Sequence, residues 1–428
     1  MRGTHAKGDF ALVLIACFLS GLVVTTHVAN AQEEGSVIIG INVPLTGPYI
    51  DQGIDEERAY KLAIEQINAK GGVIGKKISF VVKDTKSNVK VAKKNALDLI
   101  RLHKAVMVTG GVSSAVAIAQ SDVCQEQKVV FMAALTHSNA TTGHMKTKAG
   151  HTVQKAHRHT FRWFLTAWMT GKALAPFLVE RYGTGTDYFY ITADYTWGHS
   201  LERSMRWVTE LNECDTLGAI RTPLGQKDFK RELLKAKNAK PDVLVLILFG
   251  KDLIVSLKQA HVIGLSKKMK IVVPLMEEHM AHEVGPEVME GVISTLTWYS
   301  GLSKRFAGSR KFVNAFKSKY GKPPGTGGAA AWVAIHEWAS AVERAGSFAS
   351  NQVIKALEGH KFTLLKDQEE WRSWDHQAIS SVFIVEGKSK KESKGEWDLL
   401  KVIGAKKGSS VMRTREQNPI YLEPLAPE

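Results

Sequence analysis

Segments typical of buried strands alternate with segments typical of helices through the first part of the chain. Apolar strand segments are expected at Val37–Val43, Ile78–Val82, Ala105–Val108 and Val129–Met132. Helical patterns with one apolar face follow the first three, at Asp55–Ala69, Asn88–His103 and from Ala115 onward. Because parallel neighbours in a sheet need a crossover, usually a helix, this alternation predicts a parallel sheet covered by helices on both faces.

A polar stretch, Thr136–His159, then interrupts the alternation. It resumes with strand segments at Thr160–Trp163, Tyr188–Thr192, Val243–Phe249 and Lys270–Val273, which again alternate with helical patterns. Two longer helices and three further strand segments follow, at Arg310–Tyr320, Gly328–Arg344, Phe362–Leu365, Ser381–Val385 and Leu399–Ile403. The pattern predicts two α/β lobes, to which the last segments return.

The loop Thr109–Ser114 ends the third strand and opens a helix. In parallel sheets ligands lie at the carboxyl ends of the strands, where this loop is placed. Ser113 and Ser114 are good N-cap residues, and a helix N-terminus attracts anions. The loop therefore predicts a cradle for a carboxylate or another anion, with an ordinary serine-capped turn as the alternative. Its sequence matches neither the Walker loop nor the Gly-x-Gly-x-x-Gly motif.

The N-terminus has the pattern of a secretory signal peptide. Arg2 and Lys7 precede an apolar stretch, and Ala29–Ala31 supplies a small-x-small cleavage pattern. We expect residues 1–31 to be removed and Gln32 to begin the mature chain. A lipid anchor at Cys17 is the alternative, but the apolar run continues past this residue. Of the later cysteines, Cys124 and Cys214 are expected in different lobes and unpaired.

The net charge of +15 falls to +14 without residues 1–31, which hold two basic residues and one acidic residue. The lysines are dispersed, apart from a group near the end of the chain, so we interpret them mainly as solvated faces. Weak affinity for an anionic membrane surface is a possible additional role. Export argues against a nucleic-acid partner. No segment after the signal peptide is apolar enough to span a membrane.

No catalytic or metal motif is present. The sequence holds neither a Gly-x-Ser-x-Gly elbow nor a His-Glu-x-x-His pair. The five histidines of the polar stretch are spaced 7, 7, 6 and 2 residues apart, which matches no compact ligand pattern. We expect no enzyme activity, no bound metal and no cofactor; an exported enzyme stays the alternative, which turnover of a bound solute would reveal.

Two motifs are typical of a known family. Val43–Pro48 reads Val-Pro-Leu-Thr-Gly-Pro, and Asn68–Ile78 reads Asn-Ala-Lys-Gly-Gly-Val-Ile-Gly-Lys-Lys-Ile. Together with later runs they resemble the branched-chain amino acid (Leu/Ile/Val) binding proteins, which are periplasmic solute receptors of ABC importers. The later runs are Thr109–Ser114, Ala193–Gly198, Phe249–Leu265 and Glu290–Ser300. The resemblance covers essentially the whole mature chain.

The resemblance implies a type I periplasmic binding fold: two Rossmann-like lobes with parallel sheets, joined by three crossovers, with a ligand cleft between them. We place lobe one at residues 36–158 plus 292–346, lobe two at 159–291 plus 347–404, and a C-terminal tail at 405–428. Such receptors close like a hinge around their solute. The implied partners are a small solute and a membrane permease, in the periplasm. A ligand-sensing partner of a signalling receptor is the alternative function.

The resemblance also implies site residues, motif by motif. Val112, Ser113 and Ser114 match the carboxylate-binding loop. Thr136 or His137 matches the loop that takes the ligand's amino group, and Trp197 and Phe249 match aromatic positions of lobe two. Tyr195 is expected to form an aromatic lid with Trp197, or else to pack in the core at the end of its strand.

The acidic residue of the family's ammonium site is displaced in this chain. It belongs on the loop after Val273, where Pro274–Glu278 places its acids about two positions late. Either Glu277 serves after a shift of the loop, or the ammonium site is absent. The expected solute is therefore an amino acid of the branched-chain type, an amide, a urea-like solute or a small carboxylate.

Overall fold

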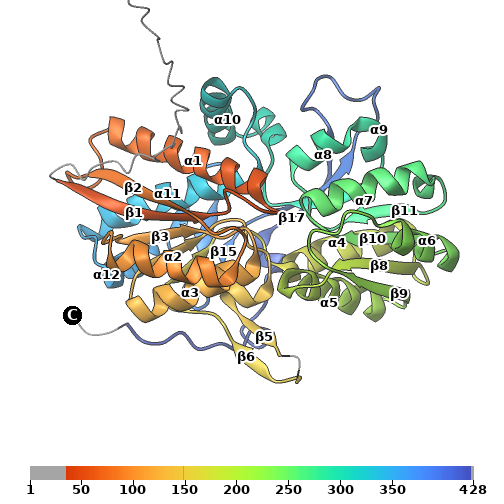
Figure 1. Cartoon of the computed structure of the whole chain (residues 1–428), viewed down its shortest axis with the longest axis horizontal. Coiled ribbons are helices and arrows are strands. Elements are labelled where there is room, and N and C mark those ends of the chain that lie inside the picture. The colour runs from red at the N-terminus through yellow and green to blue at the C-terminus, as the bar shows by residue number, and fades with distance from the viewer. Residues whose placement is uncertain (1–34, 148, 426–428) are drawn as a thin grey trace, which may run out of the picture. The chain divides into compact units, whose positions relative to one another are not determined.

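The computed structural model describes residues 35–147 and 149–425, so the predicted signal peptide and Cys17 lie outside the described residues. Two mainly parallel sheets form two lobes, as the alternation predicts (Figure 1). The fold class is confirmed. Across the described residues, no helix is both long and apolar enough to cross a membrane. Cys124 and Cys214 are buried and free, as expected.

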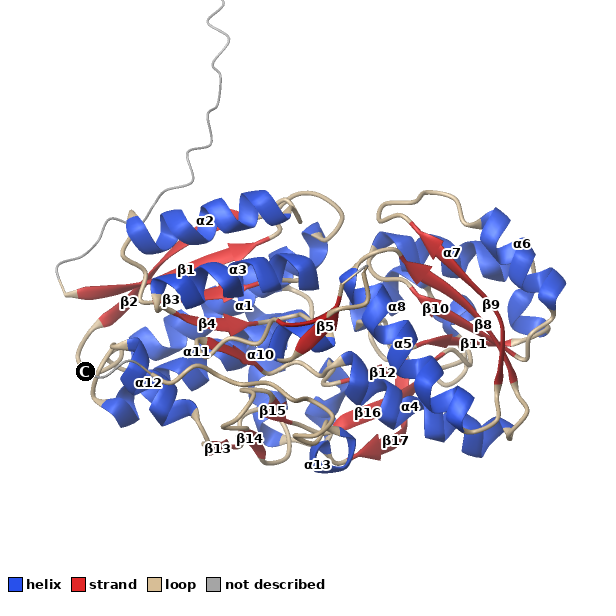
Figure 2. Cartoon of the chain, turned by 90° about the horizontal axis from the view of Figure 1, so that it is seen from below, coloured by secondary structure: helices blue, strands red, loops and turns tan. Residues whose placement is uncertain are grey.

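The sheet of lobe one is entirely parallel, with strand order β2-β1-β3-β4-β7. Helices α2 and α3 cover one of its faces, and α1 and α11 pack together on the other (Figure 2). Successive strand residues alternate between these faces: Val108 packs against Leu99 and Ala117, while Met107 belongs to the larger core. The elements are β1 Ser36–Val43, α1 Ile50–Ala69, β2 Lys77–Asp84, α2 Val89–Arg101, β3 Met107–Gly110, α3 Ser114–Gln127, β4 Val130–Ala133, η1 Asn139–Thr142, β7 Thr160–Arg162, α10 Ala307–Tyr320, α11 Thr326–Ala345 and α12 Ser350–Leu357.

The sheet of lobe two has seven strands in the order β17-β16-β12-β11-β10-β8-β9. The strands from β8 to β12 run parallel, and β16 and β17 add an antiparallel edge. Its elements are α4 Ala167–Tyr182, β8 Asp187–Ala193, α5 Thr196–Leu211, β9 Asp215–Thr222, α6 Lys230–Ala239, β10 Val243–Ile247, α7 Lys251–Val262, η2 Leu265–Lys267, β11 Lys270–Val273, α8 Glu278–Val284, α9 Pro286–Met289, β12 Ile293–Leu296, η3 Ser300–Lys304, β16 Val382–Gly387, β17 Leu400–Lys406 and α13 Gly408–Val411.

The strand pairing moves the lobe boundaries away from their expected positions. Strand β7 pairs with β4, so residues 160–162 lie in the sheet of lobe one rather than lobe two. Strand β12 pairs with β11 and β16, so residues 293–296 lie in the sheet of lobe two. Helix α12 packs on α11 of lobe one. We therefore propose that the chain crosses between lobes at 163–166, at 297–306 and between α12 and β16.

Two small antiparallel units lie outside the main sheets. A hairpin, β5 His144–Lys146 and β6 Thr152–Gln154, fills part of the polar stretch. A three-stranded sheet lies along the third crossover, formed by β13 Lys361–Phe362, β14 Glu369–Trp371 and β15 Ala378–Ile379. The polar stretch is therefore not simply a loop.

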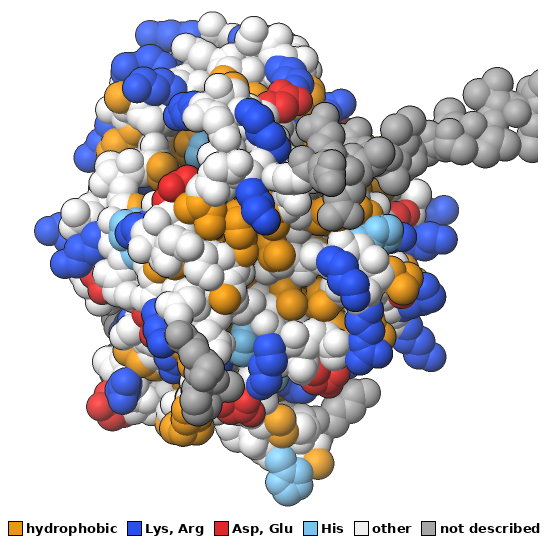
Figure 3. All heavy atoms as spheres, turned by 90° about the vertical axis from the view of Figure 1, so that its left-hand side faces the viewer, with side chains coloured by type: hydrophobic (Ala, Val, Ile, Leu, Met, Phe, Trp, Pro, Cys, Tyr) orange, Lys and Arg blue, Asp and Glu red, His pale blue; other side chains and the backbone are white. Residues whose placement is uncertain are grey.

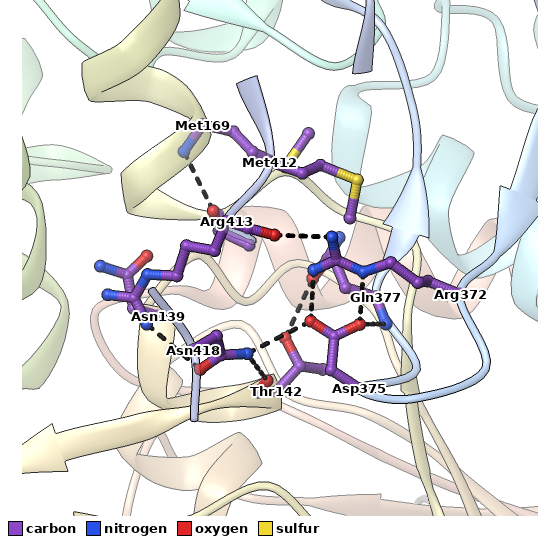
Figure 4. A pocket seen from close by; sticks show the side chains of 10 residues that line it. Asn139, Thr142, Met169, Arg372, Asp375, Gln377, Met412, Arg413 and Asn418 are labelled. Atoms are coloured by element: carbon purple, nitrogen blue, oxygen red, sulfur yellow. Dashed lines mark hydrogen bonds and ion pairs between the residues drawn. The ribbon is translucent and has the colours of Figure 1, made fainter. Parts of the chain in front are cut away.

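The C-terminal segment runs from lobe two back to lobe one. Its residue Asn418 donates to the carbonyl of Thr142 at 3.1 Å and to Asp375 at 3.2 Å, and Arg372 holds the same carboxylate (Figure 4). Further along, Tyr421 exchanges hydrogen bonds with Gln154 of the hairpin. The expected tail thus spans both lobes.

Basic side chains are distributed over the end of lobe one. Lys and Arg side chains lie at several places around this face, some next to one another, with acidic side chains near some of them (Figure 3). This agrees with solvated faces rather than one basic binding surface.

Candidate functional site

A small cavity lies between the two lobes, at the carboxyl ends of their strands. The volume that the centre of a water-sized sphere can occupy in it is about 20 Å³, so the cavity has room for roughly one water molecule. Most of its wall is aliphatic or aromatic. The lining residues are Tyr49, Val112, Ser114, Leu135, His137, Phe164, Tyr195, Trp197, Phe249 and Leu275.

Ser114 is the first residue of helix α3 and joins the two ligand loops of lobe one. Its Oγ accepts the backbone N–H groups of His137 (3.3 Å) and Ser138 (3.1 Å), and the hydroxyl of Thr136 donates to it at 3.2 Å. The hydrogen of Ser114 itself is left to donate. Because the first N–H groups of a helix have no intrahelical acceptor, the α3 N-terminus presents further donors beside it.

His137 is held as a neutral ring in one tautomer. An indole N–H can only donate, so His137 Nδ1 accepts from Trp197 Nε1 at 2.7 Å. Nε2 then carries the proton and donates to the hydroxyl of Thr170 at 2.8 Å. Burial, together with the nearby Arg162, lowers the pKa of His137 to about 3. The side chain therefore carries no charge near neutral pH, and both its nitrogens are occupied.

An aromatic cluster closes the cavity from both lobes. The hydroxyl of Tyr49 lies 2.5 Å from that of Tyr195, which joins lobe one to lobe two. Phe249 packs edge-on against Tyr49 and Trp197, with ring centroids 6.0 and 5.9 Å apart. Burial raises the pKa of both tyrosines, so both phenols stay neutral. Each hydroxyl satisfies the other inside an apolar wall.

Glu277 lies close to the cavity but does not line it. Its carboxylate accepts the backbone N–H of Gly327 at 2.8 Å, at the start of helix α11 in lobe one. Burial and the neighbouring Asp55 raise its pKa to about 8. The acid expected for an ammonium site thus caps a helix across the lobe interface.

Comparison with known proteins settles the family. The sequence profile of the periplasmic binding proteins matches residues 36–394. The chain belongs to this family. Periplasmic binding proteins are solute receptors rather than enzymes, which implies a small-molecule ligand for this chain.

Solved structures and curated relatives agree with this assignment. A periplasmic binding protein from Burkholderia mallei matches with a TM-score of 0.82 at 27% identity, over 90% of this chain and 98% of that one. A solute-binding protein from Rhodopseudomonas palustris, in complex with 3,4-dihydroxybenzoic acid, matches with a TM-score of 0.77 at 20% identity, over 88% and 98%. The leucine-, isoleucine-, valine-, threonine- and alanine-binding protein of Pseudomonas aeruginosa is 23% identical, over 82% of this chain and 88% of its own length.

Not all the predicted site residues of this periplasmic binding protein line the cavity. Those that do are Val112, Ser114, His137, Tyr195, Trp197 and Phe249. Ser113 is the N-cap of α3, but its hydroxyl makes no capping bond and it does not line the cavity. Thr136 does not line the cavity either, but its hydroxyl donates a hydrogen bond to the Oγ of Ser114. That any of them binds the solute stays a prediction.

Sequence reasoning missed four lining residues: Tyr49, Leu135, Phe164 and Leu275. Tyr49 lies shortly after β1, at the carboxyl edge of the sheet where ligands bind in parallel sheets, so its position carried a usable signal. Phe164 lies directly after β7, on the first crossover, where nothing in the local pattern marks it.

The five histidines of the polar stretch do not form a cluster. His137 lines the cavity, His157 pairs with Asp122 at 3.0 Å, and His159 bonds to Gln125 at 3.0 Å. Among residues 35–147 and 149–425, no three His, Cys, Asp or Glu side chains are placed to hold a metal ion.

Proposed function

We propose that this periplasmic binding protein takes up a small carboxylic acid with an apolar body and delivers it to its importer. The observation that carries the proposal is the composition of the cavity wall, where all but Ser114 and His137 are aliphatic or aromatic. Apolar walls with few convergent polar groups are typical of sites for small organic ligands. Closing the lobes around such a body buries its apolar surface between Leu135, Leu275 and the aromatic cluster.

The polar end of the cavity suits a carboxylate. Ser114 has a hydroxyl hydrogen free to donate, and the first N–H groups of α3 lie beside it. A carboxylate at a helix N-terminus gains both hydrogen bonds and the favourable end of the helix dipole.

The wall offers no carboxylate as a partner for an ammonium group. No carboxylate of the described residues lines the cavity, and the nitrogens of His137 are both bonded within the protein. An ammonium buried without a countercharge is strongly unfavourable. Relatives of this fold include a protein in complex with 3,4-dihydroxybenzoic acid and one named for its amino acids, so the family accommodates both chemistries. The wall of this cavity favours the first.

A matched pair of solutes tests the proposal. 4-Methylpentanoate and leucine share a carbon skeleton and a carboxylate and differ in the amino group. By titration calorimetry we expect 4-methylpentanoate to bind at least about tenfold more tightly, because leucine leaves its ammonium unpaired. Benzoate serves as a second probe with a planar body. Tighter binding of leucine would contradict the proposal and restore an ammonium site.

Substitution of Ser114 tests the polar end. Ser114→Ala removes the acceptor for two buried N–H groups and one donor to the solute, so we expect the affinity for 4-methylpentanoate or benzoate to weaken by about 1–3 kcal/mol. Ser113→Ala is the matched control, since that hydroxyl makes no capping bond and does not line the cavity. Equal losses in both variants, measured by calorimetry, would move the carboxylate site elsewhere.

We further propose export through the segment at residues 1–31. Its basic start, apolar stretch and Ala29–Ala31 pattern support cleavage before Gln32. Mass spectrometry of the exported protein should find Gln32 as the first residue, and a lipid-modified Cys17 at the N-terminus would overturn this assignment.

A further inference from the structure

A second hollow, which we call the outer groove, lies between the β5–β6 hairpin and helix α5. Its volume is about 510 Å³, against about 20 Å³ for the inner cavity. Tyr195 contributes to both hollows. The outer groove is lined by Ser138, Asn139, Ala140, His144, Met145, Lys146, Thr147, Trp168, Asp194, Tyr195, Thr196, His199, Ser200, Arg203, Ser204, Trp207 and Arg413.

Three cationic side chains of the outer groove lack a carboxylate partner. Lys146 comes from the hairpin, Arg203 from α5 and Arg413 from the C-terminal segment, and none forms an ion pair within 4.0 Å in the described part of the chain. They lie close enough that, after burial, all three lower the pKa of the half-buried His144. Burial and then Arg203 lower the pKa of Arg413, while Asp375, which Arg372 holds, raises it. Three cations against one lining carboxylate, Asp194, leave an excess of positive charge that favours an anion.

The acids near the outer groove are already engaged. Asp194, the one lining carboxylate, bonds to His199 at 2.7 Å. On the next turns of α5, Glu202 and Glu210 pair with Arg206 and Arg221. The unpaired positive charge therefore stays on the three cations.

Two tryptophans stack on each other in the wall of the outer groove. The rings of Trp168 and Trp207 lie 4.8 Å apart at 31°, and the guanidinium of Arg413 lies 5.2 Å from the centre of the Trp168 ring. Figure 4 shows Arg413 reaching toward Asn139 and Asn418. Two buried N–H donors of this wall, Trp168 Nε1 and Arg413 Nε, have no acceptor among the described residues. Buried donors without acceptors are rare in folded proteins, so they mark a place where an acceptor fits.

We propose that the outer groove binds an aromatic organic anion, its ring against Trp168 and Trp207 and its charged group among Lys146, Arg203 and Arg413. Planar guanidinium groups suit carboxylate and sulfonate oxygens, and the indole rings suit a flat body. The hairpin and the loop at Asn139 belong to lobe one, and α5 belongs to lobe two. An anion bound here contacts both lobes at the edge of the cleft.

The test uses 2-naphthalenesulfonate as the probe, because its flat ring suits the indole side chains and its sulfonate stays charged. Calorimetry should show binding that weakens as the salt concentration rises. Arg203→Gln is expected to weaken it about tenfold or more, since a charge-assisted hydrogen bond is lost. Arg203 is exposed and makes no ion pair, so its replacement should leave the melting temperature unchanged.

Arg206→Gln is the matched control on the same helix. Arg206 is paired with Glu202 and Glu210 and does not line the outer groove, so the probe should bind this variant as it binds the wild type. Trp207→Ala should also weaken binding, because the stacked pair of Trp168 and Trp207 loses one of its rings. Equal affinity of wild type, Arg203→Gln and Trp207→Ala, or no binding of the probe at low salt, would overturn the proposal.

Discussion

Replacing Arg162 with methionine is expected to destabilise the protein by about 3–5 kcal/mol and to weaken solute binding as well. Arg162 is fully buried at the end of β7, where the chain first leaves lobe one. Its guanidinium donates to the carbonyls of Thr136 and Ser138 and to the side chains of Thr142 and Gln377. Methionine fills a similar volume but leaves these acceptors unpaired away from water.

The loss of affinity follows from where these acceptors lie. The carbonyls of Thr136 and Ser138 flank His137, so the guanidinium fixes the loop that carries it. Gln377 belongs to the third crossover and pairs directly with Arg162 at 2.7 Å. Arg162 therefore ties the inner cavity to the region about which the lobes close.

Urea unfolding and calorimetry measure the two effects of this substitution. Arg181→Met is the control: Arg181 pairs with Glu386 at the surface, and such pairs contribute about 0–1 kcal/mol. Arg162→Lys should fall between wild type and Arg162→Met, because one ammonium cannot reach four acceptors in a fork. A loss in Arg162→Met no larger than in Arg181→Met would contradict the role assigned to the guanidinium.

The alternation of apolar segments was sufficient to predict the two sheets, because buried parallel strands read as continuous apolar runs. Strand β11 has the bounds that its apolar pattern predicts. Strand β9 was missed, since its side chains alternate between exposed and half-buried at the edge of the sheet. The hairpin β5–β6 was missed because its strands are short, polar and largely exposed.

Helix α1 begins at Ile50, five residues before its expected start, for a reason that lies outside the helix. A Cβ on Gly53 would lie 1.7 Å from the carbonyl oxygen of Pro44, so only glycine lets this turn approach the end of β1. That approach places Tyr49 at the cavity. No local propensity reveals such a contact, which is why the sequence located the loop but not its lining residue.

The position of Glu277 shows a similar limit. The sequence placed this acid on the loop after β11, at the correct edge of the sheet. Its partner, the N–H of Gly327, comes from a helix fifty residues later in the other lobe. Only the packing of the two lobes decides whether the carboxylate faces a solute or a helix.

Glu277 also makes the closed arrangement sensitive to pH. The loop after β11 belongs to lobe two, while the surrounding groups Gln52, Asp55, Glu56, Lys322 and Gly327 belong to lobe one. Asp55 accepts two N–H groups at the start of α11, from Gly325 and Gly328, and places its charge beside Glu277. Burial and this charge raise the pKa of Glu277 from its ordinary value of 4.5 to about 8.

The sign of the pH effect follows from that shift. A raised carboxyl pKa means that the closed arrangement holds a proton which the separated lobes release between about pH 4.5 and 8. Solute affinity is therefore expected to be full below about pH 4.5 and to fall as the pH rises toward 8. Since one proton is involved, the fall is at most about tenfold per pH unit.

Two variants distinguish the effect of Glu277 from that of other carboxyl groups whose pKa is raised. Glu277→Gln keeps an acceptor for Gly327 and does not ionise, so its affinity for 4-methylpentanoate or benzoate should be nearly constant from pH 5 to 8.

Glu337 also has a raised pKa of about 7, but it bonds to Trp371 rather than across the cleft. Glu337→Gln should alter the pH dependence of unfolding while the affinity keeps the wild-type pH profile. If Glu277→Gln retained the wild-type fall in affinity, the proton would reside on another group. Burial of the Glu277 carboxyl depends on closure of the lobes. The difference between the affinity profiles of Glu277→Gln and Glu337→Gln across pH therefore measures how strongly the closed lobes hold its proton.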